Sequence, residues 1–283
     1  MSTETFSIAF LGPFGTYSHE AALYFAEELG DPEAELLECA SFDEVFDAVD
    51  RGRTIYGVVA KENSLEGPVT STLDNFAFRS SSVILAEKVF DIHHCLMTAP
   101  EADLTQVKTI ASHLQGIAQC RRYLNERFPG RGTQVTPSTA ESARLAATDP
   151  TIASIANPLA AKLYGCTIQD ESIEDNLGNQ TAFALIGRLG SAPILGGERF
   201  KTTVALFLRV DRAGTLNMIL SEFAYADINL TMVQSRPLKQ QLGDYMFFME
   251  FEGKDTDLSA QTALACLRLK LREVKVLGSY PML

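Results

Sequence analysis

Small polar residues and glycines gather in four segments of this chain, each between a short apolar run and a stretch with helical spacing. In open α/β sheets ligands bind beyond the carboxyl ends of the strands, and the free N–H groups at a helix N-terminus attract anions. Four such segments together predict a pocket for a small anion. The segments are Gly12-Pro-Phe-Gly-Thr-Tyr-Ser18, Glu62-Asn-Ser-Leu-Glu-Gly67, Ser112-His-Leu-Gln-Gly116 and Ser138-Thr139.

A hydroxyl group in the same part of the chain could act on such a ligand. Thr181 begins the apolar run Thr181-Ala-Phe-Ala-Leu-Ile186, after the polar, turn-prone stretch 175–179. Side chains alternate between the two faces of a strand, so Thr181 and Phe183 should share one face. A hydroxyl and an aromatic ring can then project together into a cleft.

Residue spacing argues against several other chemistries. Gly12 and Gly15 fit neither the dinucleotide fingerprint nor the P-loop, so no cofactor is predicted. Ser112 and His113 are sequence neighbours and lack the Gly-x-Ser-x-Gly elbow of many hydrolases. The five cysteines include no Cys-x-x-Cys pair, and neighbouring histidines at 93 and 94 should point to opposite faces of a strand. No metal site is therefore predicted.

The composition is typical of a soluble globular protein, with 46% apolar and 21% charged residues among 283. Lys and Arg number 24 against 36 Asp and Glu, and the net charge of -12 disfavours nucleic acids and anionic membranes as partners. No apolar run is long enough to span a membrane, and residues 1–6 lack the features of a signal peptide. We therefore predict a cytoplasmic protein.

The elements that must position the polar segments follow a repeating strand–helix order as far as Phe183. Apolar runs at 7–11, 56–59 and 109–112 alternate with amphipathic stretches. Ser41-Phe-Asp-Glu44 is a capping box, which predicts the start of a helix. This alternation predicts an α/β fold with mostly parallel strands.

A different pattern follows the turn formers of Gly190-Ser-Ala-Pro-Ile-Leu-Gly-Gly197. We therefore predict an α/β region at 1–189, a linker at 190–200 and a second domain at 201–283. The second domain has the order βαββαβ, which is the ferredoxin-like arrangement. Its expected strands are 202–210, 228–235, 245–251 and 274–277, and its expected helices are 215–225 and 258–271.

The four polar segments resemble those of the prephenate dehydratase family in residue identity, order and spacing, and the likeness spans the whole chain. It also includes Thr72-Leu-Asp74, Gln119-Cys120 and Asn179-Gln-Thr-Ala-Phe183. The tail resembles the ACT regulatory domain of the same family. Ala213-Gly-Thr-Leu216 stands for the family's Gly-Ala-Leu element, and Gln234-Ser-Arg-Pro237 for its Glu-Ser-Arg-Pro.

The resemblance implies two α/β lobes, similar in fold to type II periplasmic binding proteins, with the active site between them and an ACT domain after them. It implies a lyase of L-phenylalanine biosynthesis that converts prephenate to phenylpyruvate by losing carbon dioxide and the ring hydroxyl together, without a cofactor. It also implies that phenylalanine binds where two ACT domains meet, in a homodimer or homotetramer. No chorismate mutase segment is expected before the first dehydratase strand.

Roles for individual residues also follow from the resemblance. Thr181 is the expected donor to the leaving hydroxyl, and its weak acidity favours a positioned hydrogen bond over outright proton loss. The other expected catalytic residues are Glu62, Asn63, Ser112 and Gln119. The expected substrate-binding residues are Gly15, Thr16, Lys61, Ser64, Ser138, Thr139 and Phe183. The expected phenylalanine-binding residues are Ala213, Gly214, Leu216, Asn229, Leu230, Gln234, Ser235 and Arg236.

The chain departs from the family at Ala182, where the family's Thr-Arg-Phe has arginine. This change is expected to remove a cation from a site whose substrate carries two negative charges, at a cost of roughly 1.5 to 3 kcal/mol. Lys61, an unexpected cation beside Glu62, is a candidate replacement. Two alternatives stay open. One is an enzyme that acts on arogenate or decarboxylates prephenate without expelling the hydroxyl, and the other is a catalytically degenerate paralogue that senses an amino acid.

Overall fold

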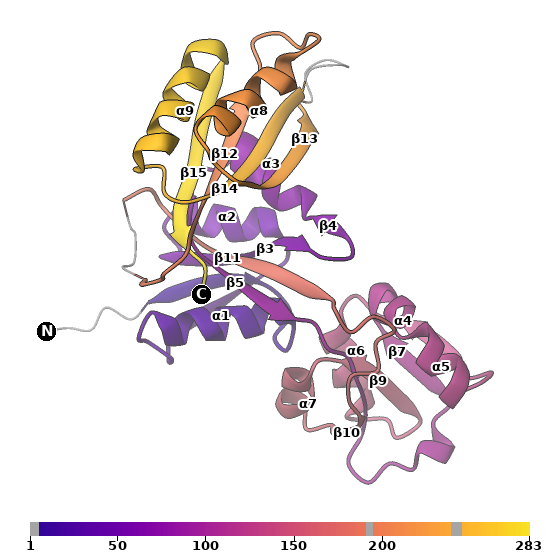
Figure 1. Cartoon of the computed structure of the whole chain (residues 1–283). Helices are drawn as coiled ribbons and strands as arrows, with labels where there is room; N and C mark the ends of the chain where they lie inside the picture. The colour runs from indigo at the N-terminus through magenta and orange to yellow at the C-terminus, as the bar shows by residue number, and fades with distance from the viewer. Residues whose placement is uncertain (1–5, 191–194, 239–244) are drawn as a thin grey trace, which may run out of the picture.

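The computed structural model describes residues 6–190, 195–238 and 245–283, and Figure 1 shows them arranged around three sheets. Two of the sheets, with their helices, form two lobes of an α/β region. The third belongs to a C-terminal domain that packs on the first lobe. The predicted fold class, a two-lobed α/β region followed by a βαββαβ unit, is confirmed.

Lobe 1 is built on a sheet with the strand order β2-β1-β3-β11-β5, to which β4 is added beside β3. Helix α1 buries its apolar residues on one face of this sheet, and α2 and α3 bury theirs on the other. The elements are β1 (Ser7–Leu11), α1 (Tyr17–Glu28), β2 (Glu35–Cys39), α2 (Phe42–Asp50), β3 (Tyr56–Asn63), β4 (Gly67–Pro68), α3 (Thr70–Phe78), β5 (Val83–Asp91) and β11 (Gln180–Gly187).

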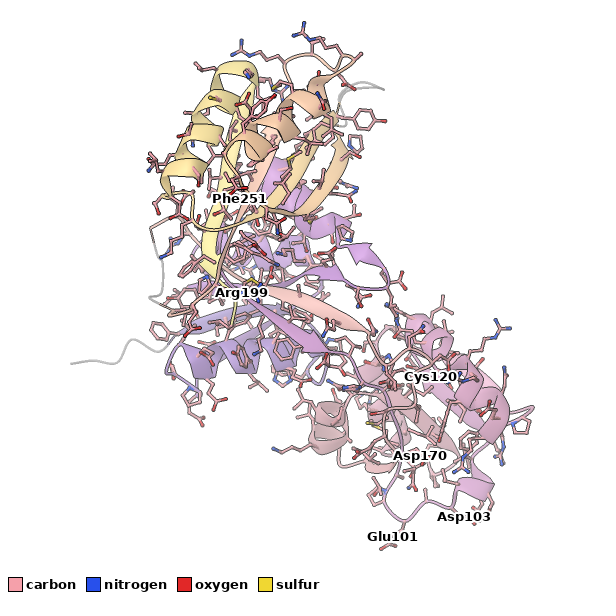
Figure 2. The ribbon with its side chains drawn as sticks, viewed as in Figure 1. Glu101, Asp103, Cys120, Asp170, Arg199 and Phe251 are labelled. Carbon is pink, nitrogen blue, oxygen red and sulfur yellow. The ribbon has the colours of Figure 1, made fainter. Side chains whose placement is uncertain are left out.

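Lobe 2 has the strand order β10-β6-β9-β7-β8, and Cys120 lies in its core (Figure 2). The helical stretch after Ser112 is divided at Cys120, where the carbonyl of Gln119 accepts a hydrogen bond from the N–H of Asp175. The elements are β6 (Cys95–Thr98), β7 (Thr109–Ser112), α4 (Leu114–Gln119), α5 (Arg121–Arg127), β8 (Gly132–Val135), α6 (Thr139–Ala146), β9 (Ile152–Ala156), α7 (Pro158–Tyr164) and β10 (Thr167–Asp170), with a short 3-10 turn at Leu104–Gln106.

Both sheets of the α/β region are mixed, so the expectation of mostly parallel strands is only partly correct. Strands β1, β2 and β3 pair in parallel, as do β7, β8 and β9, whereas β11 is antiparallel to both its neighbours. Strand β6 is likewise antiparallel to β9 and β10. The cause is that the chain crosses between the lobes twice, from β5 to β6 and back from β10 to β11.

The two crossing segments, 92–94 and 171–179, are hydrogen-bonded to each other between the lobes. The N–H of Ile92 donates to the carbonyl of Asn179 at 2.8 Å, and the N–H of Ile173 donates to that of His94 at 2.9 Å. Glu174 accepts from the N–H of His94 at 2.9 Å and lies 2.8 Å from Nδ1 of His93. The lobes are therefore connected by two chain segments that are hydrogen-bonded to each other.

The C-terminal domain has the βαββαβ order that the sequence predicted, and its sheet has the order β13-β14-β12-β15. Helices α8 and α9 cover one face around Phe251 (Figure 2). The other face shares a core with α2 and α3 of lobe 1, through Phe248 and Tyr280. The elements are β12 (Phe200–Phe207), α8 (Thr215–Tyr225), β13 (Leu230–Pro237), β14 (Tyr245–Glu252), α9 (Leu258–Lys270) and β15 (Glu273–Pro281).

Gly278 of β15 lies against β5 of lobe 1. It has a φ of +147°, and a Cβ atom there would stand 2.3 Å from the carbonyl oxygen of Ile84 in β5. Only glycine fits this approach. The domain boundaries expected around a 190–200 linker stay a prediction, and residues 191–194 lie outside the described residues.

Within the described parts of the chain, the structure contains no helix with both the length and the apolar character needed to cross a membrane.

Candidate functional site

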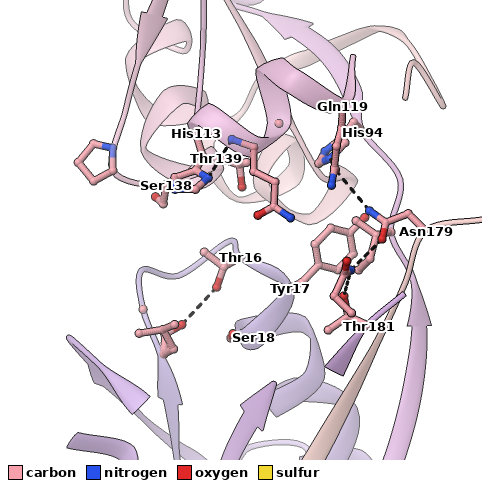
Figure 3. A pocket seen from close by; sticks show the side chains of 17 residues that line it. Thr16, Tyr17, Ser18, His94, His113, Gln119, Ser138, Thr139, Asn179 and Thr181 are labelled. Atoms are coloured by element: carbon pink, nitrogen blue, oxygen red, sulfur yellow. Dashed lines mark hydrogen bonds between the residues drawn. The ribbon is translucent and has the colours of Figure 1, made fainter. Parts of the chain in front are cut away.

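A cavity of about 280 Å³ lies between the two lobes, and both contribute to its wall (Figure 3). None of the described residues that line it is Lys, Arg, Asp or Glu, so its polarity comes from hydroxyls, amides, imidazoles and backbone groups. We call it the interlobe pocket. Its lining residues are Leu11, Gly12, Thr16, Tyr17, Ser18, Asn63, Ile92, His94, His113, Gln115, Gly116, Gln119, Pro137, Ser138, Thr139, Asn179 and Thr181.

Helix α1 presents its first turn to the interlobe pocket from lobe 1. Thr16 is its N-cap, with Oγ1 accepting from the N–H of His19 and donating to the carbonyl of Pro13 at 2.9 Å. Gly15 does not line the pocket, but its φ of +88° and the hydrogen bond from its N–H to Nδ1 of His19 shape the loop. The first N–H groups of a helix lack intrahelical partners, so this end of α1 favours an anion.

Helix α6 presents its N-terminus to the same pocket from lobe 2. Ser138 is its N-cap, and Oγ accepts from the N–H of Glu141 at 3.0 Å. Both Ser138 and Thr139 line the pocket. Two helix N-termini from different lobes therefore face one uncharged cavity, and together they suit a ligand with two negatively charged groups.

A chain of side-chain hydrogen bonds runs along the wall of the pocket, and Figure 3 shows part of it. Asn63 donates from Nδ2 to Oγ1 of Thr181 at 2.9 Å and to Oδ1 of Asn179 at 2.8 Å. Asn179 donates from Nδ2 to Oε1 of Gln119 at 3.3 Å, and Nε2 of His94 lies 2.8 Å from the same oxygen. Because the oxygen of Thr181 is already an acceptor, its hydroxyl proton is left to donate elsewhere.

Six of the residues that the sequence predicted for the site line the interlobe pocket: Thr16, Asn63, Gln119, Ser138, Thr139 and Thr181. Their roles stay predictions, although the structure brings them together from both lobes.

Three other predicted residues do not line the interlobe pocket: Ser112 and Phe183 are buried, and Ser64 is exposed outside it. Ser112 is fully buried and donates to the carbonyl of Ile155 at 2.7 Å. Ser64 donates from Oγ to the carbonyl of Gly178 and accepts from the N–H of Gln180. Phe183 packs edge-to-face on Phe90 in the core of lobe 1. Each side chain is occupied by contacts within the protein, so the geometry does not support direct substrate contacts from these residues, and their roles stay predictions.

Lys61 does not line the interlobe pocket either, so the geometry does not support its expected role as a replacement for the family arginine. Its side chain is 2% exposed, and Nζ donates to Glu87, to Oε1 of Glu250 at 2.6 Å and to the hydroxyl of Tyr280 at 3.1 Å. Burial opposes the charged form, but the two carboxylates outweigh it and hold the pKa of Lys61 well above its ordinary value.

A β-bulge explains where the 61–63 segment points. The register of β3 against β11 advances by two residues, from Glu62 to Ala60, while β11 advances by one, from Ala182 to Phe183. Lys61 is the extra residue, and Lys61 and Glu62 both line a second cavity of about 240 Å³ rather than opposite faces. Ala182 lines this second cavity too and does not line the interlobe pocket, and the effect of its replacing the family arginine stays a prediction.

The predicted effector-binding residues lie in the C-terminal domain. Gly214 caps α8 with a φ of +88°, Leu216 in the first turn is 38% exposed, and Leu230 begins β13. Near the end of β13, Arg236 donates from Nη2 to Oδ1 of Asp74 in α3 at 2.6 Å. This part of the predicted effector site therefore touches lobe 1.

Sequence reasoning missed His94 and Asn179 as members of the wall. Asn179 begins the Asn179-Gln-Thr-Ala-Phe183 motif that the family resemblance includes, and strand alternation bears on His94 only as a metal ligand. A signal was present, because His94 directly precedes the apolar run from Cys95 to Met97, and a polar residue that is buried beside such a run needs a hydrogen-bond partner.

Comparisons with known proteins agree with the architecture. The sequence profile described as prephenate dehydratase matches residues 8–191. Prephenate dehydratase of Methanocaldococcus jannaschii is 36% identical over 272 residues, covering 95% of this chain and 96% of that protein. The crystal structure of prephenate dehydratase from Arthrobacter aurescens, in complex with L-Phe, aligns with a TM-score of 0.87 at 35% identity, covering 97% of this chain and 89% of that one. A protein described as a novel type of quorum-quenching acylase aligns with a TM-score of 0.85 at 28% identity, covering 98% of each chain.

Proposed function

The chain belongs to the prephenate dehydratase family, and we propose that it converts prephenate to phenylpyruvate, carbon dioxide and water. The observation that carries the proposal is the uncharged interlobe pocket with Thr181 in its wall. Two helix N-termini offer N–H groups to the two carboxylates of prephenate, and the hydroxyl of Thr181 is held with its proton free.

The proposed reaction needs few protein groups. The bond between the ring and its carboxylate breaks, and its electron pair enters the ring as carbon dioxide leaves. The bond from the opposite ring carbon to its hydroxyl oxygen breaks at the same time, which makes the ring aromatic. Negative charge moves from the carboxylate to the departing oxygen, where a hydrogen bond from Thr181 stabilises it, and proton uptake from water completes the release.

The uncharged wall contributes to this charge movement. A fixed cation beside the carboxylate would stabilise the ground state and oppose loss of its charge, whereas neutral donors aimed at the leaving oxygen favour the transition state. We assign Thr181 as the donor, and Asn63 as the residue that positions it. Gln119 and the N-terminal turns of α1 and α6 hold the substrate.

Product analysis tests the proposed reaction. Incubation with prephenate should yield phenylpyruvate, and incubation with arogenate should yield little phenylalanine. A decarboxylated product that retains the ring hydroxyl would favour the non-aromatising alternative, and no product from either substrate would favour the degenerate sensor. The measurement is needed because a shared fold does not fix the reaction, as the acylase relative illustrates.

We also propose that residues 201–283 form an ACT domain, joined by the 190–200 linker, that binds L-phenylalanine and regulates the enzyme. Support comes from the L-Phe complex of the Arthrobacter aurescens relative and from the βαββαβ order. Strand β13 lies at the edge of the described sheet, where a second copy could add its own edge in a homodimer or homotetramer. Calorimetry with millimolar phenylalanine tests the binding claim, which fails if no heat of binding is released. Light scattering tests the claim of a homodimer or homotetramer, which fails if only a monomer is found.

A further inference from the structure

The orientation of the Asn63 amide determines the orientations of the other side-chain amides in the pocket wall. Oδ1 of Asn63 accepts from the backbone N–H groups of Leu65 and Glu66, both at 3.0 Å. A backbone N–H can only donate, so this atom of Asn63 must be the oxygen and the other must be Nδ2. The direction of every following hydrogen bond depends on this assignment.

The orientation of Asn63 also determines those of Asn179 and Gln119, and through them the protonation of His94. Nδ2 of Asn63 donates to Asn179, which must present Oδ1 there and therefore presents Nδ2 to Gln119. Gln119 then presents Oε1 to both Asn179 and His94. Because this oxygen can only accept, Nε2 of His94 must carry a proton.

The remaining ring nitrogen of His94, Nδ1, lies in surroundings that favour its unprotonated state. The side chain is 5% exposed, and Nδ1 has no hydrogen-bond partner among the described residues. A proton there would leave a buried, charged N–H without an acceptor, which costs more than an unpaired lone pair. Burial also lowers the pKa of His94 below its ordinary value. The ring is therefore neutral, with its proton on Nε2.

The same geometry leaves the amide nitrogen of Gln119 unused. Nε2 of Gln119 is buried in the wall of the interlobe pocket and has no partner within the described part of the chain. Buried N–H groups are nearly always paired in the working state of a protein. An acceptor on a bound ligand, such as a carboxylate or keto oxygen, would pair it.

We propose that His94 is a positioning residue of the dehydratase reaction, which holds the Gln119 amide with its N–H groups turned to an acceptor oxygen of the substrate. The inference rests on the proposed function and adds His94 to it. His94 acts together with Asn179, since both hydrogen bonds end on the oxygen of Gln119. Without them the amide could rotate and turn its oxygen toward a substrate anion, which would repel it.

A double-mutant cycle with a matched control variant tests this role. His94→Leu should lower kcat/KM about ten- to hundredfold, whereas His94→Gln, whose amide N–H can still reach Gln119, should stay within about threefold of the parent. In a Gln119→Leu background, His94→Leu should cost less than about threefold, because His94 acts through Gln119. Losses that multiply in the double variant, or a His94→Gln variant as poor as His94→Leu, would overturn the proposal.

A second measurement stays independent of activity. The ¹⁵N chemical shifts of the His94 ring in the unliganded protein should show a protonated Nε2 and an unprotonated Nδ1 at pH 7. A protonated Nδ1 at that pH would overturn the proposed role of His94, even if the enzyme is active. An enzyme that does not turn over prephenate, yet shows the expected ring state, instead removes the proposed function and with it the assigned role.

Discussion

Lys61 of β3 and Glu250 of β14 form a buried ion pair, with 2.6 Å between Nζ and Oε1 and each side chain 2% exposed. Glu87 of β5 accepts from the same ammonium and from Lys201 of β12 at 2.8 Å. Burial raises the pKa of Glu87, but the two lysines outweigh it and lower the pKa below its ordinary value. The strand that ends at Asn63 is thus joined through charges to the central strands of the C-terminal domain.

Replacement of Lys61 by methionine should therefore lower stability and have little effect at the pocket. The change leaves Glu87 and Glu250 buried with only Lys201 nearby, and loss of one partner from a buried pair costs about 3 to 5 kcal/mol. Urea denaturation should show this loss, while KM of the folded fraction stays within about threefold. Lys162→Met, at an exposed position, is the control and should change neither. A tenfold rise in KM with unchanged stability would return Lys61 to the substrate site.

The 61–63 segment also shows what the sequence can and cannot predict. The strand, the polar end and its place at a sheet edge follow from the apolar run and the following loop. Alternation alone would place Lys61 and Glu62 on opposite faces of the strand, because it assumes an unbroken register. The bulge opposite Ala182 and Phe183 depends on how β3 pairs with β11, more than 110 residues later, and no local pattern encodes it.

Some residues of the pocket wall could likewise be predicted from the sequence, and others could not. The capping residues Thr16 and Ser138 were found because helix N-termini have a local sequence signature. Ser112 has the same residue type and strand-end position, yet its hydroxyl is used by Ile155 of the neighbouring strand. His94 reaches the pocket only because the two crossing segments meet between the lobes. Tertiary pairing therefore decides which polar residues are free to bind a ligand.

Thr181→Val should lose turnover about a hundredfold or more without a change in stability above about 1 kcal/mol. Valine keeps the shape of threonine and removes the hydroxyl proposed to donate to the leaving oxygen, and loss of one such hydrogen-bond donor costs about 10² to 10³ in rate. Single-turnover kinetics with prephenate measures the effect. Near-parental turnover would mean that another group stabilises the leaving oxygen.

Asn63→Asp should reduce turnover about as much as Thr181→Val. A carboxylate cannot donate to Thr181 or to Oδ1 of Asn179, so the threonine hydroxyl would instead donate to the carboxylate and lose its free proton. Rate measurement and the melting temperature, taken together, separate this effect from unfolding. A variant that keeps full activity at a parental melting temperature would show that Asn63 does not set the direction of the Thr181 hydroxyl.

Stability should fall as the pH drops below about 6.5, the ordinary range for histidine, and activity should fall at a lower pH, where His94 becomes protonated in the folded protein. The pKa of His94 is lower in the folded protein because of burial, so the unfolded chain binds a proton first and the folded state loses relative stability as pH falls. The groups near the ring are Glu174, which favours its charged form, and His93, which opposes it. In a kcat/KM profile, His94→Gln should shift or remove the acid limb. An unchanged limb would assign it to another group.

Phenylalanine should control activity through the contact between Arg236 of β13 and Asp74 of α3. The ion pair joins the end of a predicted effector-binding strand to lobe 1, and both side chains are 15% exposed. Allosteric coupling requires that the effector favour one of two arrangements, and reciprocity requires substrate to change effector affinity by the same factor. Asp74→Asn lies on the lobe 1 side of this contact, so it should leave the phenylalanine affinity of the unliganded enzyme within about threefold. The coupling free energy between phenylalanine and activity should shrink by about 0.5 to 2 kcal/mol.

Asp43→Asn is the matched control, because the pair of Asp43 with Arg79 lies wholly within lobe 1. Calorimetry with and without the substrate, beside rates with and without phenylalanine, gives the coupling from both directions. A full response in Asp74→Asn, or an equal loss in Asp43→Asn, would show that the signal reaches lobe 1 by another contact.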